Sequence, residues 1–174
     1  MRIAVGLLAI ALGAASPARA ATTAELLRCQ KGIHSRAASF VKLVETALSS
    51  CAYKVESCQL GQEIDGADPS ACLASATASC TSLSARVPSY KATYSTKAQL
   101  VCGVPLGDLA PYVAGLGMSP QIGTCGASTT SDLIACIFTA AQCSAERTVF
   151  ALDPRAQDAL STAGVAGAHP CVGP

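Results

Sequence analysis

The sequence predicts an all-α protein, a disulfide-clamped long antiparallel helical hairpin followed by a smaller C-terminal helical unit. Apolar residues recur at steps of three and four over much of the chain, the period of an amphipathic helix. Six of the ten cysteines are also placed as mirror images about one point. Paired from the outside inward, their residue numbers add up to 131, 131 and 130, as two antiparallel helices of equal rise per residue require. The predicted pairs are Cys29–Cys102, Cys51–Cys80 and Cys58–Cys72.

Residues 1–20 have the pattern of a signal peptide. A positive start precedes the apolar run Ile3–Leu12, and Ala18-Arg19-Ala20 fits the small-x-small cleavage rule. The run is shorter than the roughly 20 residues that a membrane span needs, and we expect no transmembrane segment in the mature chain. The sequence therefore predicts an exported protein, extracellular or periplasmic, with one domain over 21–174. This domain comprises the hairpin 22–103 and the C-terminal helical unit 104–174.

The first long helix begins at a capping box formed by Thr22 and Glu25. An apolar stripe then continues to Cys58, and a polar, acidic turn is predicted over Gly61–Gly66. The residues of the apolar stripe recur at helical spacing: Leu26, Cys29, Ile33, Ala37, Phe40, Val44, Ala47, Cys51, Val55 and Cys58.

The second long helix is predicted to start at Asp68 as N-cap, with Pro69 at the first helical position. Pro88 should kink or break it, because proline lacks the N–H that the helix needs. The helix is expected to end at Cys102. On this helix Cys102 lies about 120° from Cys72, so the outermost crosslink departs furthest from a single stripe.

The C-terminal unit opens with a short helix around Asp108–Ala114, inside the glycine- and proline-rich connector Leu109–Ser131. A third clear helix begins near Ser131, and Asp153-Pro154 opens a short helix that Gly164 closes. The remaining four cysteines allow three connectivities. Short chain returns favour two of the possible pairs, Cys125–Cys136 and Cys143–Cys171.

Composition and charge narrow the functional classes. An even number of cysteines in an exported chain favours disulfides over thiols. Without its first twenty residues the chain has ten basic and eleven acidic side chains, a net charge of −1. This net charge is no electrostatic footprint for nucleic acid, which requires a clustered basic surface, and it does not suggest strong attraction to anionic lipid. The chain has no Trp and much alanine, so its core is thin; disulfides, at roughly 2–4 kcal/mol each, offset this.

Three features of the sequence resemble known families. The segment Cys51–Cys58, with a glycine-containing loop and Ala71-Cys72-Leu73, resembles the cysteine-rich repeats of Golgi-apparatus-type proteins, which are helical hairpins. The nested pairing looks like saposin topology, although the two opening cysteines of saposins are missing. The segments Leu26–Lys31, Phe40–Lys42 and Ala47–Cys51 are similar to exported alanine- and cysteine-rich helical bacterial proteins of unassigned function. The resemblances imply a fold and no mechanism.

The residues that carry chemistry elsewhere are scattered here. His34 and His169 are interpreted as solvated surface side chains, and no nucleophile, base and orienting group can be placed together, so we predict no catalytic residues, no metal site, no cofactor and no enzyme. Glu63, Asp65 and Asp68 cluster in a turn, where capping explains them better than calcium binding. A cysteine-lined copper(I) store is the remaining metal hypothesis.

Binding is therefore the predicted class of function. The main hypothesis is a non-catalytic structural or binding module whose partner is an unknown protein or a small hydrophobic ligand, and the alternative is a carrier of a lipid or another small hydrophobe. Four tyrosines are candidate contact residues, and the preferred interpretation is that they complete the core. They are Tyr53, Tyr90, Tyr94 and Tyr112.

Overall fold

The computed structural model describes residues 19–169 and residue 171. Most of the predicted signal peptide, residues 1–18, lies outside these described residues. The described chain is all-helical, with six α-helices and one short 3-10 helix and no strand within it. The predicted fold class is confirmed.

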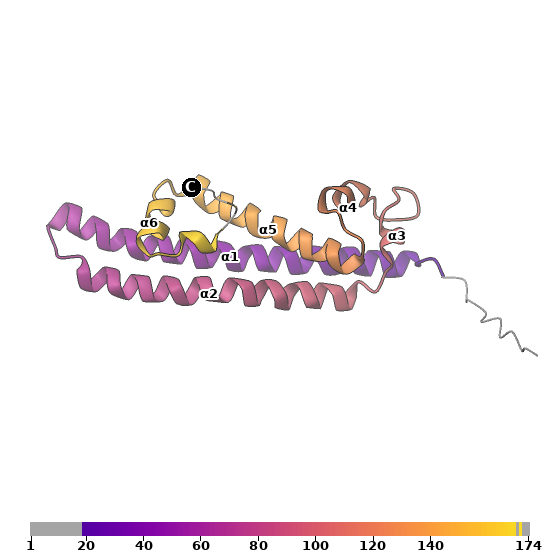
Figure 1. Ribbon diagram of the computed structural model, residues 1–174, viewed down its shortest axis with the longest axis horizontal. Coiled ribbons are helices and arrows are strands. Elements are labelled where there is room, and N and C mark those ends of the chain that lie inside the picture. The colour runs from indigo at the N-terminus through magenta and orange to yellow at the C-terminus, as the bar shows by residue number, and fades with distance from the viewer. Residues whose placement is uncertain (1–18, 170, 172–174) are drawn as a thin grey trace, which may run out of the picture.

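Two long helices form the hairpin and run antiparallel along its full length (Figure 1). Helix α1 covers Thr23–Asp65 and is about 65 Å long at 1.5 Å per residue. Helix α2 covers Ser70–Val101 and packs against α1, which extends beyond it (Figure 1). The capping box at the start of α1 is present: the Thr22 hydroxyl accepts from the Glu25 N–H, and the Glu25 carboxylate accepts from the Thr22 N–H at 2.7 Å.

Three disulfides join α1 to α2 at intervals along the hairpin. The bonded pairs are Cys29–Cys102, Cys51–Cys80 and Cys58–Cys72, the pairs that the mirror spacing predicts. Their Cα atoms are 4.1, 4.9 and 5.6 Å apart. Cys102 reaches Cys29 because it is the C-cap of α2, where the backbone has left helical geometry (φ −97°, ψ 70°). Its angle on an ideal helix therefore does not apply.

Three details of the predicted hairpin are wrong. The turn is shorter than Gly61–Gly66, because α1 continues to Asp65 and ends at Gly66, whose φ of 66° suits glycine. Pro69 precedes α2, and the Asp68 carboxylate accepts from the Ser70 N–H. Pro88 lies inside a continuous α2, so of the predicted kink or break the break is wrong. Disulfides to α1 lie on both sides of it, so the lost backbone hydrogen bond is tolerated.

The C-terminal unit packs along one face of the hairpin (Figure 1). Its short predicted helix is only α3, Leu106–Leu109, and the predicted connector contains a further helix, α4, Ser119–Cys125. Helix α5, Thr130–Leu152, runs back along α1 and carries its own capping box. Helix α6, Ala156–Thr162, and the 3-10 helix Ala166–Ala168 follow. Two disulfides join Cys125 to Cys136 and Cys143 to Cys171, matching the favoured connectivity.

The core lies between α1, α2 and α5. Phe40 and Phe138 are fully buried, and their ring centroids are 5.7 Å apart. Most other core side chains are small aliphatic residues and half-cystines, as the thin-core prediction requires. Tyr90 and Tyr94 pack against this core. Tyr53 and Tyr112 do not, since both are well exposed, and for them the core interpretation is wrong.

Candidate functional site

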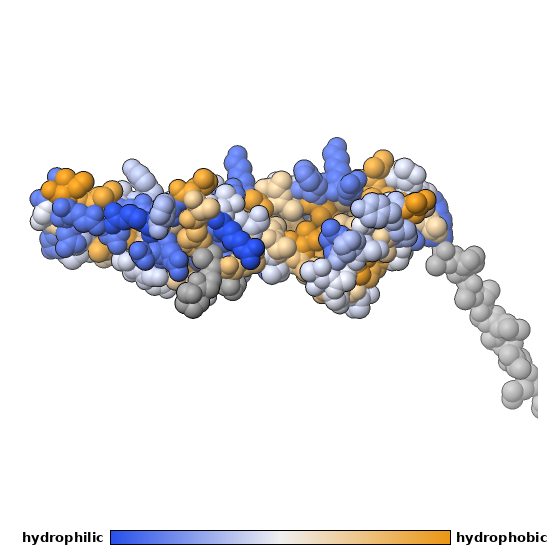
Figure 2. All heavy atoms as spheres, turned by 90° about the horizontal axis from the view of Figure 1, so that it is seen from above, coloured by the Kyte–Doolittle hydropathy of each residue, from blue (hydrophilic) through white to orange (hydrophobic). Residues whose placement is uncertain are grey.

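A groove of about 490 Å³ lies on the C-terminal-unit side of α1 and is here called the hydrophobic groove. One wall is a stripe of α1, where Ile33, Ala37 and Val41 recur at helical steps of four. Ile137 of α5 also lines the groove. Figure 2 shows hydrophobic residues gathered midway along this face. The stripe that continues into the core therefore also lines an open surface.

The opposite wall is the segment between α3 and α4, where Leu116, Gly117 and Met118 face the groove. Residues 110–118, here called the tyrosine loop, form a compact loop whose ends are tied together. The Leu109 carbonyl accepts from the N–H groups of Leu116 (3.2 Å) and Met118 (3.1 Å), and the Ala110 carbonyl accepts from Ser119. These bonds give the wall a defined shape.

Covalent bonding fixes the same wall to the rest of the molecule. The disulfide Cys125–Cys136 joins the end of α4 to α5, with Cα atoms 5.9 Å apart. A smaller hollow of about 210 Å³ lies along this bridge and shares Gln121 and Ile137 with the hydrophobic groove. The two hollows adjoin, which gives the site an elongated outline suited to an extended ligand.

Polar groups occur at the groove only as Gln30, His34 and Gln121. His34 is exposed, in agreement with its interpretation as a surface histidine. An apolar lining with a few polar groups is the usual composition of a small-molecule site. These side chains offer hydrogen bonds to a polar end of a ligand, and the remaining lining offers apolar contact.

The interpretation of His169 as a solvated side chain is wrong, because His169 is only 2% exposed. Its Nε2 lies 3.3 Å from the Ser84 hydroxyl, and its Nδ1 lies 3.2 Å from Glu146 Oε1. Glu146, fully buried, also accepts from the Gln142 amide at 2.7 Å and from the Cys171 N–H at 3.2 Å. This network, here called the buried histidine network, connects the C-terminal tail with α2 and α5.

A hydroxyl, an imidazole and a carboxylate thus do come together, contrary to the sequence prediction. Their order is that of the catalytic triad of serine hydrolases. Ser84, however, is mostly buried in the middle of α2, where neighbouring N–H groups are engaged in helical hydrogen bonds and do not form an oxyanion hole. The cavities described above do not include Ser84 or His169. The geometry favours a structural role for this network.

A group of charged side chains lies where α1 approaches the α5–α6 junction. Arg155 donates to both carboxylate oxygens of Glu63, at 2.7 and 3.3 Å, and this lowers the pKa of Glu63. Burial and the neighbouring Asp153 raise the pKa of Glu56, although Arg155 partly offsets them. One oxygen of Glu56 is buried without a hydrogen-bond partner. The ionised Glu56 carboxylate therefore lies in an electrostatically unfavourable position.

The predicted acidic cluster is dispersed by these contacts. Glu63 pairs with Arg155, and Asp68 accepts from Ser70, which lowers the pKa of Asp68. Within the residues that the structure describes, no three His, Cys, Asp or Glu side chains gather as a metal site requires. All ten cysteines are paired in disulfides.

Sequence reasoning missed the hydrophobic groove. Leu116, Met118 and Ile137 lie in segments that the sequence treats as a connector and as a core helix. The one available signal was the absence of charge over residues 109–131, which is typical of a connector and also of an apolar wall. The chain matches no protein-family model, no curated protein and no solved structure.

Proposed function

We propose that the protein is a non-catalytic, exported, disulfide-stabilised binding module that carries a small hydrophobic ligand in the hydrophobic groove. The observation that carries the proposal is the groove itself. Its volume of about 490 Å³ falls within the range of roughly 300–1,000 Å³ typical of small-molecule sites. Five disulfides in one short chain support an oxidising, exported environment.

The lining indicates an extended aliphatic ligand, such as one acyl chain with a polar end. Each buried methylene contributes about 0.8 kcal/mol, so about ten would supply at most about 8 kcal/mol. That sum corresponds to a dissociation constant of about 1 μM before the cost of immobilising the ligand. Because the groove is open, we expect micromolar or weaker binding and a ligand that exchanges readily.

The copper(I) hypothesis needs a chemical change first. Copper(I) prefers thiolate ligands, and every cysteine here is oxidised. Such a store would take up metal only after reduction of the disulfides that join α1 to α2. The hydrophobic carrier uses the oxidised protein as it stands, which favours it.

The proposal is tested by titrating the fluorescent probe N-phenylnaphthylamine into the oxidised protein and then displacing it with a fatty acid. Ala38 is exposed on α1 and lines the groove, so Ala38→Trp fills the site while the helix is preserved. We expect at least a tenfold loss of probe affinity. Ala85→Trp, on an exposed position of α2, is the matched control and should bind as the wild type does.

Two results would refute the carrier function. One is an absence of saturable probe binding by the wild-type protein. The other is equal binding by Ala38→Trp and the control, because the probe would then occupy another surface. Native mass spectrometry of protein from its source gives an independent check, since a carrier should retain an apolar molecule.

A further inference from the structure

We infer that the end of the molecule bearing the groove docks on an anionic lipid surface, with the tyrosine loop entering the interface. The inference deepens the proposed function, because a carrier must exchange its ligand with a lipid source. The inference depends on the proposed carrier function only to explain what docking would achieve. The docking itself follows from three other features: an apolar loop tip, an uncharged loop, and a separation of charge along the molecule.

The tip of the tyrosine loop presents two adjacent apolar side chains to solvent. Tyr112 is 87% exposed and Val113 is 86% exposed. The next residue, Ala114, has a left-handed backbone with φ 64°, a conformation that non-glycine residues seldom adopt. The chain therefore holds this tip in a defined, unfavourable shape while leaving its apolar groups in water.

The chemistry of the tip suits a membrane interface. Tyrosine is enriched there because its ring is apolar and its hydroxyl is wet. Residues 109–131 contain no charged side chain, so insertion of the loop buries no charge. Gly117 lines the groove, and its Cα is close enough to the Tyr112 ring that an added Cβ would contact the ring at 3.4 Å. The loop that enters the lipid would thus also form the groove wall.

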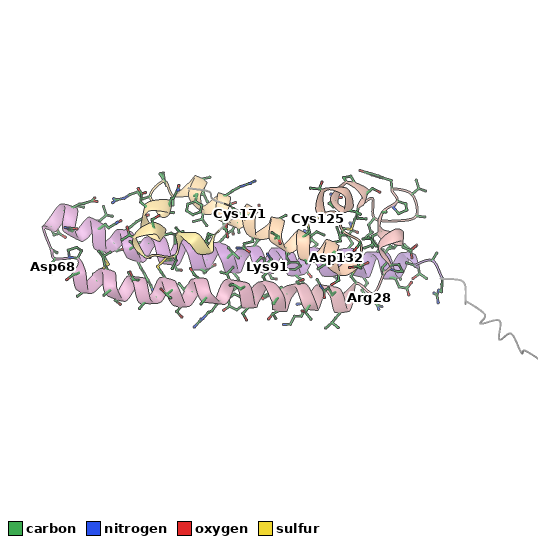
Figure 3. All side chains as sticks on the ribbon, viewed as in Figure 1. Arg28, Asp68, Lys91, Cys125, Asp132 and Cys171 are labelled. Carbon is green, nitrogen blue, oxygen red and sulfur yellow. A yellow bond between two sulfur atoms is a disulfide. The ribbon has the colours of Figure 1, made fainter. Side chains whose placement is uncertain are left out.

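Charge is strongly separated along the molecule although its sum is near zero. Without the predicted signal peptide, the groove end, residues 21–44 and 87–140, holds six basic and three acidic side chains. The turn end, residues 45–86 and 141–171, holds four basic and eight acidic side chains. Figure 3 shows Arg28 in the half that carries α3 and α4, together with the acidic Asp132, while Lys91 lies near the middle of the molecule and Asp68 at the opposite end. A positive end complements an anionic lipid surface, and a negative end is repelled by it. The charges therefore give the docked molecule an orientation.

Basic residues also lie beside the groove itself. Lys31 is seven residues before the groove residue Ala38, and Lys42 is four residues after it, which places both within about 40° of Ala38 around α1. Both lysines are exposed. None of the described helices has both the length and the hydrophobicity to cross a bilayer, and the docking inferred here needs no crossing.

The test is co-sedimentation of the oxidised protein with vesicles of equal parts phosphatidylcholine and phosphatidylglycerol, compared with phosphatidylcholine alone. We expect binding to the anionic vesicles that weakens as salt rises, because screening shortens from about 10 Å at 0.1 M to about 3 Å at 1 M. Equal binding to both vesicle types would overturn the inference, and so would binding to neither.

Variants test the tip and the charges separately. Val113→Asp should weaken vesicle binding at least tenfold, whereas Leu152→Asp, at an equally exposed position (81%) of the turn end, should not. Replacing Lys31 and Lys42 with Gln should weaken it about 25-fold, at about fivefold per basic side chain. The matched double variant, Lys54→Gln with Arg147→Gln, lies at the turn end and should bind as the wild type does. Equal effects of variants and controls would contradict the docking.

The two proposals fail in distinguishable ways. Ala38→Trp should lose the probe and keep vesicle binding, and Val113→Asp should lose vesicle binding and keep the probe in solution. Wild-type protein that binds the probe but no vesicle would support the carrier function and refute the docking. Protein that binds vesicles but no probe would do the reverse.

Discussion

The buried histidine network supports a quantitative prediction about how the C-terminal tail is held. Glu146 accepts hydrogen bonds from the Gln142 amide, the His169 ring and the Cys171 backbone, and its side chain is fully buried. Replacing it with alanine leaves all three donors without their acceptor. Because His169 also contacts Ser84, the same change loosens the tail from α2.

The expected cost of Glu146→Ala is about 3–5 kcal/mol, because three hydrogen-bond donors lose their acceptor. A buried donor without a partner costs roughly 1–3 kcal/mol, and here three donors are affected, one of them only partly buried. At roughly 2–4 °C per kcal/mol for a chain of this size, the melting temperature should fall by about 10 °C. Glu146→Gln keeps one acceptor oxygen and should cost about half as much.

Thermal unfolding followed by circular dichroism measures this effect under oxidising conditions. Arg147→Ala, an exposed neighbour on α5, is the control and should change the melting temperature little. Amide hydrogen exchange should rise most over residues 156–169, because the network attaches the tail. A Glu146→Ala protein that melts within about 2 °C of the control would refute the stabilising role of the network.

Three further predictions concern stability. Glu56→Gln should stabilise the protein at neutral pH by about 1 kcal/mol, since it removes a partly buried carboxylate that faces Asp153. Because the pKa of Glu56 is raised in the folded protein, this gain should shrink as pH falls through that raised value and be lost below the ordinary glutamate pKa of about 4.3; equal gains at pH 3 and pH 7 in thermal unfolding would contradict it. Asp132→Asn should lower the melting temperature slightly, because the carboxylate caps α5. Hydrogen bonds from Ser128 and from the N-cap residue Thr129 lower the pKa of Asp132, so the difference in melting temperature from the wild type should disappear only as pH falls through that lowered pKa. Gly32→Ala should destabilise by about 1 kcal/mol in denaturant unfolding, because the new Cβ would lie 2.8 Å from Val101 Cγ1 and this strain outweighs the gain in helix propensity. Adding Val101→Ala should recover part of the lost stability, because it removes Cγ1 and leaves only the Val101 Cβ, at 3.1 Å.

The hairpin could be predicted because the spacing of its cysteines follows a simple numerical rule that can be read from the sequence. Equal rise per residue in two antiparallel helices makes the cysteine numbers of each pair add to a constant, and Cys51–Cys80 and Cys58–Cys72 follow it. Helix ends are less regular. Gly61 is compatible with a turn or a helix, and only Gly66, with its positive φ, marks the true end of α1. Local preference alone does not separate the two.

The groove and the buried histidine network could not be predicted in the same way. Ser84 and His169 are 85 residues apart, and no period or mirror relation connects them. Their contact depends on where the Cys143–Cys171 bridge leaves the tail, which the sequence left as one of three connectivities. Likewise, Leu116 and Met118 form a groove wall only because the ends of the tyrosine loop are tied through the Leu109 carbonyl. Such long-range closures follow from three-dimensional packing.

The separation of charge is an intermediate case. A net charge near zero predicts weak electrostatic interactions, and that inference from the whole chain overlooks where each charge lies. The mirror rule that pairs the cysteines also pairs every other position of the hairpin. It sets Lys91 and Lys97 opposite residues 40 and 34 of α1, near the basic Lys31 and Arg36, and keeps Glu63 and Asp65 beside the turn. The register that positions the disulfides therefore also makes the two ends of the hairpin electrostatically opposite. The net charge of each end, rather than that of the whole chain, is the quantity that bears on binding to an anionic surface.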